Sequence, residues 1–267
     1  MRMEQFLKPT MITDGLAVLR ADNPSEMTLE GTNSYLLFDP ATTLQAGTEV
    51  IVVDPGPEIE EHLATLASYN VQLILITHRH ADHTEGIDRL VELTGAPVRA
   101  RLAKHCRAAD VFEDLEVISA AGTSVRVEFT PGHTSDSVCF IQLAQQNRLL
   151  TGDTVLGRGT TIIDSPDGTL RDYLSSLDRL LALEDMSLHP AHGPQHEQSH
   201  KLLTAYRTHR MQRLDQVRAA LVGLSAHAAD VAPEQLVAAV YPEIDANLVG
   251  AAARSLEAQL TYLASQS

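Results

Sequence analysis

The stretch "ITHRHADHTEG", residues 76–86, places three histidines and an aspartate within six positions. The apolar run "VQLILIT" (71–77) leads into it, and the segment "TEGIDRLVEL" (84–93) follows with helical spacing of its apolar residues. This order predicts a loop at the carboxyl end of a strand, where α/β proteins place their sites. Three imidazoles and a carboxylate so close together suit a divalent metal ion. The candidate ligands in this loop are His78, His80, Asp82 and His83.

The rest of the first two hundred residues alternates between strand-like and helix-like segments. Branched or apolar runs that end at Gly, Pro or Asp predict strands; they are 33–38, 49–54, 71–77, 125–130, 137–143 and 148–153. Helical spacing of apolar residues predicts helices at 58–68, 84–93 and 170–183. Because strands and helices interleave, we expect an α/β fold.

The character of the sequence changes after about residue 197. The segments 200–224, 232–242 and 246–266 predict helices, the last two with plausible starts at Pro233 and Asp245. The sequence therefore predicts a catalytic domain over residues 1–197 and a small helical module over residues 198–267.

Further metal ligands are expected at other strand ends, because one loop cannot surround two ions. His133 stands in a Pro-Gly turn after the strand at 125–130. Asp153 ends the strand at 148–153, and His192 lies among turn residues after "MSLHP". Each of the three alone could be an ordinary polar residue, but together with the first loop they predict a metal centre.

These motifs resemble the signature of the metallo-β-lactamase superfamily, a T-H-x-H-x-D-H loop followed by single His, Asp and His ligands. The loop begins here at Thr77, and "VVDPG" (52–56) is similar to the early aspartate motif of the family. The resemblance implies an αββα sandwich with a metal cleft along one edge, and it makes Asp54 a structural residue near the metals.

The resemblance also implies a role for each ligand. His78, His80 and His133 would bind a first zinc ion, and Asp153 would bridge it to a second one. The second ion would be bound by Asp82, His83 and His192. A hydroxide shared by the two ions would be the nucleophile, and Asp82 would act in catalysis by orienting it and accepting its proton. We expect two Zn²⁺ ions per chain, although iron or manganese would fit the same residues.

Two more segments and the helical tail resemble a narrower group, the lactamase-beta-like subfamily with its C-terminal winged-helix-like module. They are "LEGTNSYLL" (29–37) and "GDTVLGRGTTIID" (152–164). Some members of this group are endoribonucleases that act on single strands, and others are thioesterases that act on acyl carriers. Within these segments we expect Asn33, Arg158 and Thr160 to contact the substrate.

For the activity we expect first an endoribonuclease-like phosphodiesterase, with a thioester hydrolase of the hydroxyacylglutathione or acyl-carrier type as the alternative. Two basic runs, 99–107 and 201–218, favour an endoribonuclease-like phosphodiesterase. A net charge of −15 and an aromatic content of only 4%, without Trp, favour a thioester hydrolase instead. A non-catalytic module that binds metal or nucleic acid is the third reading, against which the complete ligand set argues.

The sequence also bears on location and partners. It has two cysteines, no export signal and no apolar run of about 20 residues. We therefore expect a cytoplasmic protein without a membrane segment, acting on a small thioester or on single-stranded RNA, as a monomer or a homodimer.

Overall fold

The computed structural model describes residues 8–242, 244–245 and 249–266. The chain forms two compact units. The first comprises the described residues up to Phe129 together with Asp136–Gly159 and Met186–Glu197. The second comprises Thr130–Ser135, Thr160–Asp185 and the described residues from Gln198 onward. The domain boundary between residues 197 and 198 stays a prediction.

The first unit contains a six-stranded sheet whose strands follow one another in chain order. They are β1 (Thr10–Thr13), β2 (Leu16–Arg20), β3 (Asn33–Leu37), β4 (Glu49–Val53), β5 (Asn70–Leu75) and β6 (Val98–Arg99). Pairings from β1 to β4 are antiparallel, and those from β4 to β6 are parallel. Parallel neighbours need crossover connections, which contain α1 (Glu60–Ala67) and α3 (Ile87–Thr94).

A five-stranded sheet forms the second layer of this unit, in the order β11-β10-β9-β8-β7. Its strands are β7 (Val117–Ala120), β8 (Thr123–Phe129), β9 (Val138–Leu143), β10 (Arg148–Gly152) and β11 (Ser187–Pro190). The six predicted strands are thus confirmed as β3, β4, β5, β8, β9 and β10, with small shifts at their ends.

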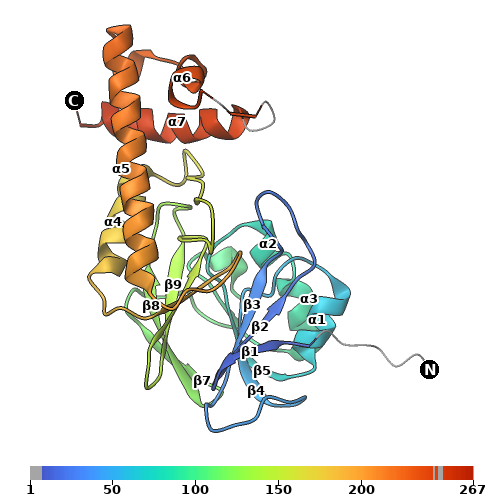
Figure 1. Ribbon diagram of the computed structural model, residues 1–267. Helices are drawn as coiled ribbons and strands as arrows, with labels where there is room; N and C mark the ends of the chain where they lie inside the picture. The colour runs from blue at the N-terminus through green and yellow to red at the C-terminus, as the bar shows by residue number, and fades with distance from the viewer. Residues whose placement is uncertain (1–7, 243, 246–248, 267) are drawn as a thin grey trace. The chain divides into compact units, whose positions relative to one another are not determined.

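The central strands are mostly apolar because most of their residues are buried, on both faces of the sheet. Along β4, Val52 packs with Leu63 of α1 in one core. The next residue in the strand, Val53, points to the opposite face and packs with Phe140 of β9 in a second core. Helices therefore cover one face of the first sheet, and the second sheet covers the other (Figure 1). The predicted αββα metallo-β-lactamase sandwich is confirmed.

The predicted helix at 84–93 is displaced, because the chain passes close to another loop at Gly86. A short helix, α2 (Ala81–Thr84), ends before this residue, and α3 begins after it. The Gly86 N–H donates to the Gly56 carbonyl over 2.9 Å. A Cβ atom at Gly86 would lie 2.8 Å from the Leu63 side chain, so the close approach requires glycine. This contact holds the loop that contains the candidate metal ligands beside residues 54–56.

The second unit is helical apart from its loops. Its helices are α4 (Leu170–Leu181), α5 (Ser199–Leu224), η2 (Ala228–Asp230), α6 (Pro233–Val240) and α7 (Val249–Ala264). Buried residues recur along α5 at Leu203, Tyr206, Leu214, Val217 and Leu221, the spacing of a helix with one buried face. The predicted helices at 170–183, 200–224 and 232–242 are confirmed.

The last predicted helix, 246–266, corresponds to α7, and its residues 246–248 lie outside the described residues. The described residues from 198 onward contain helices and no strand, and a winged-helix-like module stays a prediction. Even α5, with 26 residues, is not apolar enough to cross a membrane, and the same holds for every other described helix.

Candidate metal centre

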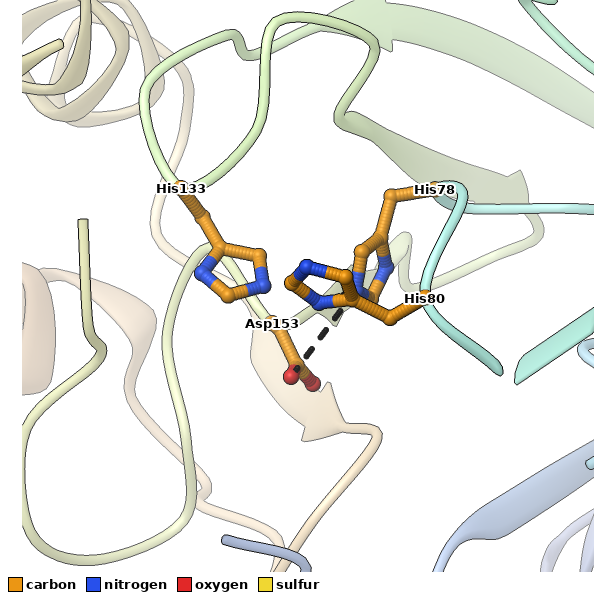
Figure 2. Close-up of side chains that lie close together, drawn as sticks. All are labelled: His78, His80, His133 and Asp153. Atoms are coloured by element: carbon orange, nitrogen blue, oxygen red, sulfur yellow. Dashed lines mark hydrogen bonds and ion pairs between the residues drawn. The ribbon is translucent and has the colours of Figure 1, made fainter. Parts of the chain in front are cut away.

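The predicted ligands form two groups among the described residues. The first contains His78, His80, His133 and Asp153, and the second contains Asp82, His83 and His192. Within each group, one ligand-capable atom per residue lies within 4.8 Å of the others. Figure 2 shows the side chains of the first group turned toward one another. The two sets are those expected from the sequence, with Asp153 among the ligands of the first.

Asp153 also faces the second group. Its Oδ2 atom lies 3.9 Å from His78 Nε2 in the first group, the contact dashed in Figure 2. Its Oδ1 atom lies 3.6 Å from His83 Nε2 and 3.3 Å from His192 Nε2. The two carboxylate oxygens thus point to different groups, an arrangement that suits the predicted bridging role.

Asp54 organises the loop through its carboxylate. It is buried and takes a positive φ of 53°, a conformation for which Asp and Asn are the usual non-glycine residues. Its carboxylate accepts from the Thr77 N–H over 2.8 Å and from the Thr77 hydroxyl over 2.7 Å. It also lies 2.8 Å from His83 Nδ1. Asp54 therefore holds the His83 ring with its Nε2 atom directed to the second group.

The same network reaches the first group. Because Thr77 Oγ1 donates to Asp54, it can accept from His78 Nδ1, which lies 3.1 Å away. The Thr77 carbonyl accepts from the Val138 N–H over 2.9 Å, which ties the loop to the start of β9. Hydrogen bonds of this kind fix the tautomer and orientation of ligand histidines.

His192 is held by the segment that precedes β3. Its Nδ1 atom lies 3.3 Å from the Gly31 carbonyl oxygen, so Nε2 is the atom that faces the second group. The Asn33 side chain donates to the Pro190 and Gly193 carbonyls over 3.0 and 3.1 Å. Tyr35 donates to the Pro190 carbonyl over 2.7 Å. These hydrogen bonds from β3 hold the backbone before and after His192.

His133 is positioned within the second unit. Its Nδ1 atom lies 2.7 Å from the Ile162 carbonyl oxygen, so Nε2 is its candidate ligand atom. The preceding Gly132 has a φ of 142°, and a Cβ atom there would lie 2.3 Å from the Tyr173 backbone. The turn before His133 therefore requires glycine at position 132, because any side chain there would clash with the Tyr173 backbone.

The electrostatics of the second group favour a bound cation. The Nε2 atoms of His83 and His192 are buried and make no hydrogen bond within the described part of the chain. Both face the Asp82 carboxylate, at 3.4 and 3.1 Å. Burial lowers the pKa of His192, but Asp153 and Asp82 outweigh it and raise the pKa to about 9. Protons or a metal ion must supply positive charge here, and imidazole and carboxylate are the donors that zinc accepts. The residues present therefore fit a divalent metal ion.

The predicted substrate residues have different surroundings. Asn33 is buried, and its side-chain amide donates to the Pro190 carbonyl at the end of β11. Arg158 is about half exposed and pairs with Glu30. Thr160 is exposed and belongs to the second unit. Their contacts with substrate stay predictions.

Among the other histidines, His189 lies three positions before His192, in β11. Its Nε2 atom lies 2.9 Å from the Ser187 hydroxyl, and burial lowers its pKa to about 4. It belongs to neither ligand group. The sequence did not identify Gly31 as the partner of His192, because a backbone carbonyl leaves no side-chain signal.

The two-sheet α/β fold and the clustered His and Asp ligands define a class, the metal-binding hydrolases of the αββα type. The profile of the metallo-beta-lactamase superfamily matches residues 27–192. The chain belongs to this superfamily, and the His and Asp cluster is its candidate metal centre.

Individual relatives agree with this assignment. The chain is 32% identical over 255 residues to the lactamase-like protein vrtG of Penicillium aethiopicum, with 92% of this chain and 77% of the relative covered. It is 35% identical over 181 residues to the atrochrysone carboxyl ACP thioesterase of Aspergillus fumigatus, with 64% of this chain and 53% of that protein covered. The crystal structure of a metallo-beta-lactamase family protein from Thermus thermophilus shares the fold, with a TM-score of 0.75 and 22% identity over 96% of this chain and 95% of that one.

Proposed function

We propose that this chain is a metal-dependent thioester hydrolase that acts on acyl-carrier thioesters, with two zinc ions held by the two ligand groups. The observation that carries the proposal is the pair of adjacent ligand groups with one Asp153 oxygen toward each. Divalent ions supply Lewis acidity, which activates water and polarises the carbonyl that is attacked. A cytoplasmic location belongs to the same proposal.

Asp82 is the carboxylate best placed to orient an attacking water molecule. Its side chain is 28% exposed, compared with 12% for Asp153, so it is the more open carboxylate of the cluster. Burial raises its pKa, but His83 and His192 outweigh this and hold the pKa well below its usual range. Asp82 is therefore ionised at neutral pH and can orient an attacking water molecule by accepting a hydrogen bond from it.

The surroundings of the first basic run argue against RNA as the preferred substrate. Arg99 makes two hydrogen bonds to the Glu116 carboxylate, at 2.7 and 2.9 Å. Arg107 pairs with Asp88 over 2.7 Å, and Arg101 stacks on a phenylalanine ring, 4.3 Å from its centre. This run is thus largely neutralised or engaged within the protein.

The second basic run is engaged in the same way. Arg207 pairs with Asp178 over 2.5 Å, and Arg218 pairs with Asp215 over 2.9 Å. Arg210 is buried and donates to the Thr161 carbonyl. RNA binding depends on cations that neutralise phosphates, and a chain of net charge −15 repels a polyanion at long range. A thioester makes no such demand, and the relative named as an ACP thioesterase supports this choice.

The test is a direct assay of metal-loaded protein on an acyl-carrier thioester, with release of the free thiol as the readout. We expect turnover that Asp82→Ala abolishes. The control variant Asp88→Asn, a 77% exposed acid on α3, should keep the wild-type rate.

A short single-stranded RNA in parallel tests the endoribonuclease-like alternative, which would use the same ligands. RNA cleavage that Asp82→Ala abolishes, without thioester turnover, would replace the proposal. Two bound ions without turnover on either substrate would favour a non-catalytic binding module.

A further inference from the structure

Two segments that contact His192 carry opposite charges next to their points of contact. Gly31, whose carbonyl faces His192 Nδ1, follows Glu30. Gly157, whose N–H donates to the His192 carbonyl over 2.8 Å, precedes Arg158. Glu30 and Arg158 form an ion pair with each other. The ion pair therefore joins the two segments that hold His192. Each member of the pair is the sequence neighbour of a glycine that contacts His192.

The backbone beneath Glu30 is fixed. Leu29 has a φ of 56°, and Gly31 has a φ of 125° with its N–H bonded to the Thr28 carbonyl over 2.9 Å. A Cβ atom at Gly31 would lie 2.0 Å from the Ala21 carbonyl oxygen, so this close approach requires glycine.

The backbone before Arg158 is equally constrained. A Cβ atom at Gly157 would lie 2.2 Å from the Pro194 carbonyl oxygen. The backbone segments that carry Glu30 and Arg158 are thus held next to His192 by packing that does not depend on the ion pair between the two side chains.

The ion pair itself is open to exchange. The Arg158 and Glu30 side chains are 53% and 40% exposed, and exposed pairs contribute little to stability. Within the described residues, Glu30 is the only partner of the Arg158 guanidinium. A guanidinium binds carboxylate and phosphate groups through paired N–H donors, so a substrate anion can take the place of the Glu30 carboxylate.

We propose that Arg158 is a specificity-determining residue that binds an anionic group of the thioester substrate, a phosphate or a carboxylate, and that Glu30 occupies Arg158 until the substrate displaces it. The inference rests on the proposed thioester hydrolase function and adds a substrate class to it. Arg158 favours substrates whose thiol carrier is negatively charged. Glu30 competes with the substrate anion for the Arg158 guanidinium and so weakens the binding of every anion.

A matched pair of substrates tests this. Acetyl-pantetheine and its 4′-phosphate contain the same thioester and differ only in the phosphate. The wild type should prefer the phosphorylated compound. In Arg158→Gln the ratio of the two kcat/KM values should fall by roughly 10- to 100-fold, the loss of a charge-assisted hydrogen bond, and the change should lie in KM. S-acetylglutathione tests a thioester whose carrier has carboxylates instead of a phosphate. If Arg158→Gln lowers kcat/KM for this substrate only, the anion that Arg158 binds is a carboxylate.

The variant Glu30→Gln separates recognition from a structural role. Removal of the competing carboxylate should lower KM for the phosphorylated substrate several-fold, opposite in sign to Arg158→Gln. If the pair only fastened the two segments together, both variants would impair both substrates alike, and this result would overturn the inference. Arg218→Gln removes a comparably exposed Arg from its pair with Asp215 and should leave the substrate ratio as in the wild type.

A binding measurement keeps this test independent of turnover. Calorimetric titration of the metal-loaded protein with 4′-phosphopantetheine should give a Kd that Arg158→Gln raises and Glu30→Gln lowers. Absence of thioester turnover together with this binding pattern would reject the proposed function and retain the anion site. Turnover with identical Kd and substrate ratio in all three proteins would reject the anion site and retain the function.

Discussion

Replacement of Asp54 by Asn tests the most specific feature of the metal centre. Asn tolerates a positive φ as Asp does, so the variant keeps the backbone at φ 53° and changes only the side chain. Asn can still accept from the Thr77 N–H, but its NH₂ group faces His83 Nδ1, where the carboxylate accepted. Two donors would then oppose each other, and His83 would move its proton to Nε2, the atom directed to the second ligand group.

The magnitude follows from the hydrogen bond that is lost. A hydrogen bond to a charged group contributes about 1.5–3 kcal/mol, which corresponds to roughly 10- to 100-fold in an equilibrium constant. Loss of an outer partner of a ligand histidine typically costs a similar factor in metal affinity. We therefore expect the weaker of the two zinc-binding steps to lose about 10- to 100-fold in affinity in Asp54→Asn.

The assay is a competition titration of metal-free protein with zinc and a chromophoric chelator, which reports the number of ions and their Kd values. The matched control is Asp39→Asn, which alters an acid that accepts from the Ala41 N–H in a turn after β3. Circular dichroism of the metal-free proteins checks that the fold is intact. Two ions bound by Asp54→Asn with wild-type affinity would refute the role that we assign to Asp54.

Three further predictions concern the ligands, the pH dependence of stability and the packing of the loop. Asp153→Ala should lose the bridge between the groups and most activity while the fold survives, and wild-type turnover at unchanged metal content would contradict this. Burial lowers the pKa of His62 to about 4, so between about pH 6.5 and 4 the unfolded chain binds a proton that the folded chain does not, and the free energy of unfolding falls as the pH is lowered. Relative to pH 7.5, this contribution amounts to about 2 kcal/mol at pH 5, and urea unfolding should show a correspondingly smaller loss in His62→Gln; an equal loss would contradict the assignment. Gly152→Ala would place a Cβ atom 2.7 Å from Thr77 Cβ and should destabilise the protein by roughly 1–3 kcal/mol in thermal or urea unfolding. Gly47→Ala, also at positive φ but with open space around it, isolates the contact from the backbone effect, and equal losses in both variants would rule out the contact as the cause.

The sequence predicted the parts of the fold that repeat one chemical property over many residues. β4 is buried on both faces from its second residue onward and β5 is buried over its last three residues, so their apolar runs are easily recognised. β1, β6 and β7 are edge strands of two to four residues, and so short a run carries too little of the pattern. The residues of the two candidate ligand groups could be named from the sequence because metal binding needs particular residue types at strand ends.

Pairings between distant segments were not predictable. The run from 93 to 109 contains no acidic residue, which favoured a free basic surface. The partners of Arg99 and Arg107 are Glu116 and Asp88, which lie on either side of that run. A free basic surface cannot be told from a neutralised one by counting charges along the chain, because the fold decides which carboxylates reach the arginines.

The anchoring of the ligand histidines has a consequence for stability. His83, His133 and His192 are each oriented through Nδ1 by a different acceptor, namely the Asp54 carboxylate and the carbonyls of Ile162 and Gly31. These acceptors are distant in sequence from the histidines that they hold, so none of the three orientations exists in the unfolded chain. Metal binding is then coupled to folding, and a bound ion stabilises the native state in proportion to the logarithm of its affinity. A change in an anchor should therefore reduce the stability gained on adding zinc more than the stability of the metal-free protein, whereas a packing change such as Gly152→Ala should reduce the stability of the metal-free protein directly.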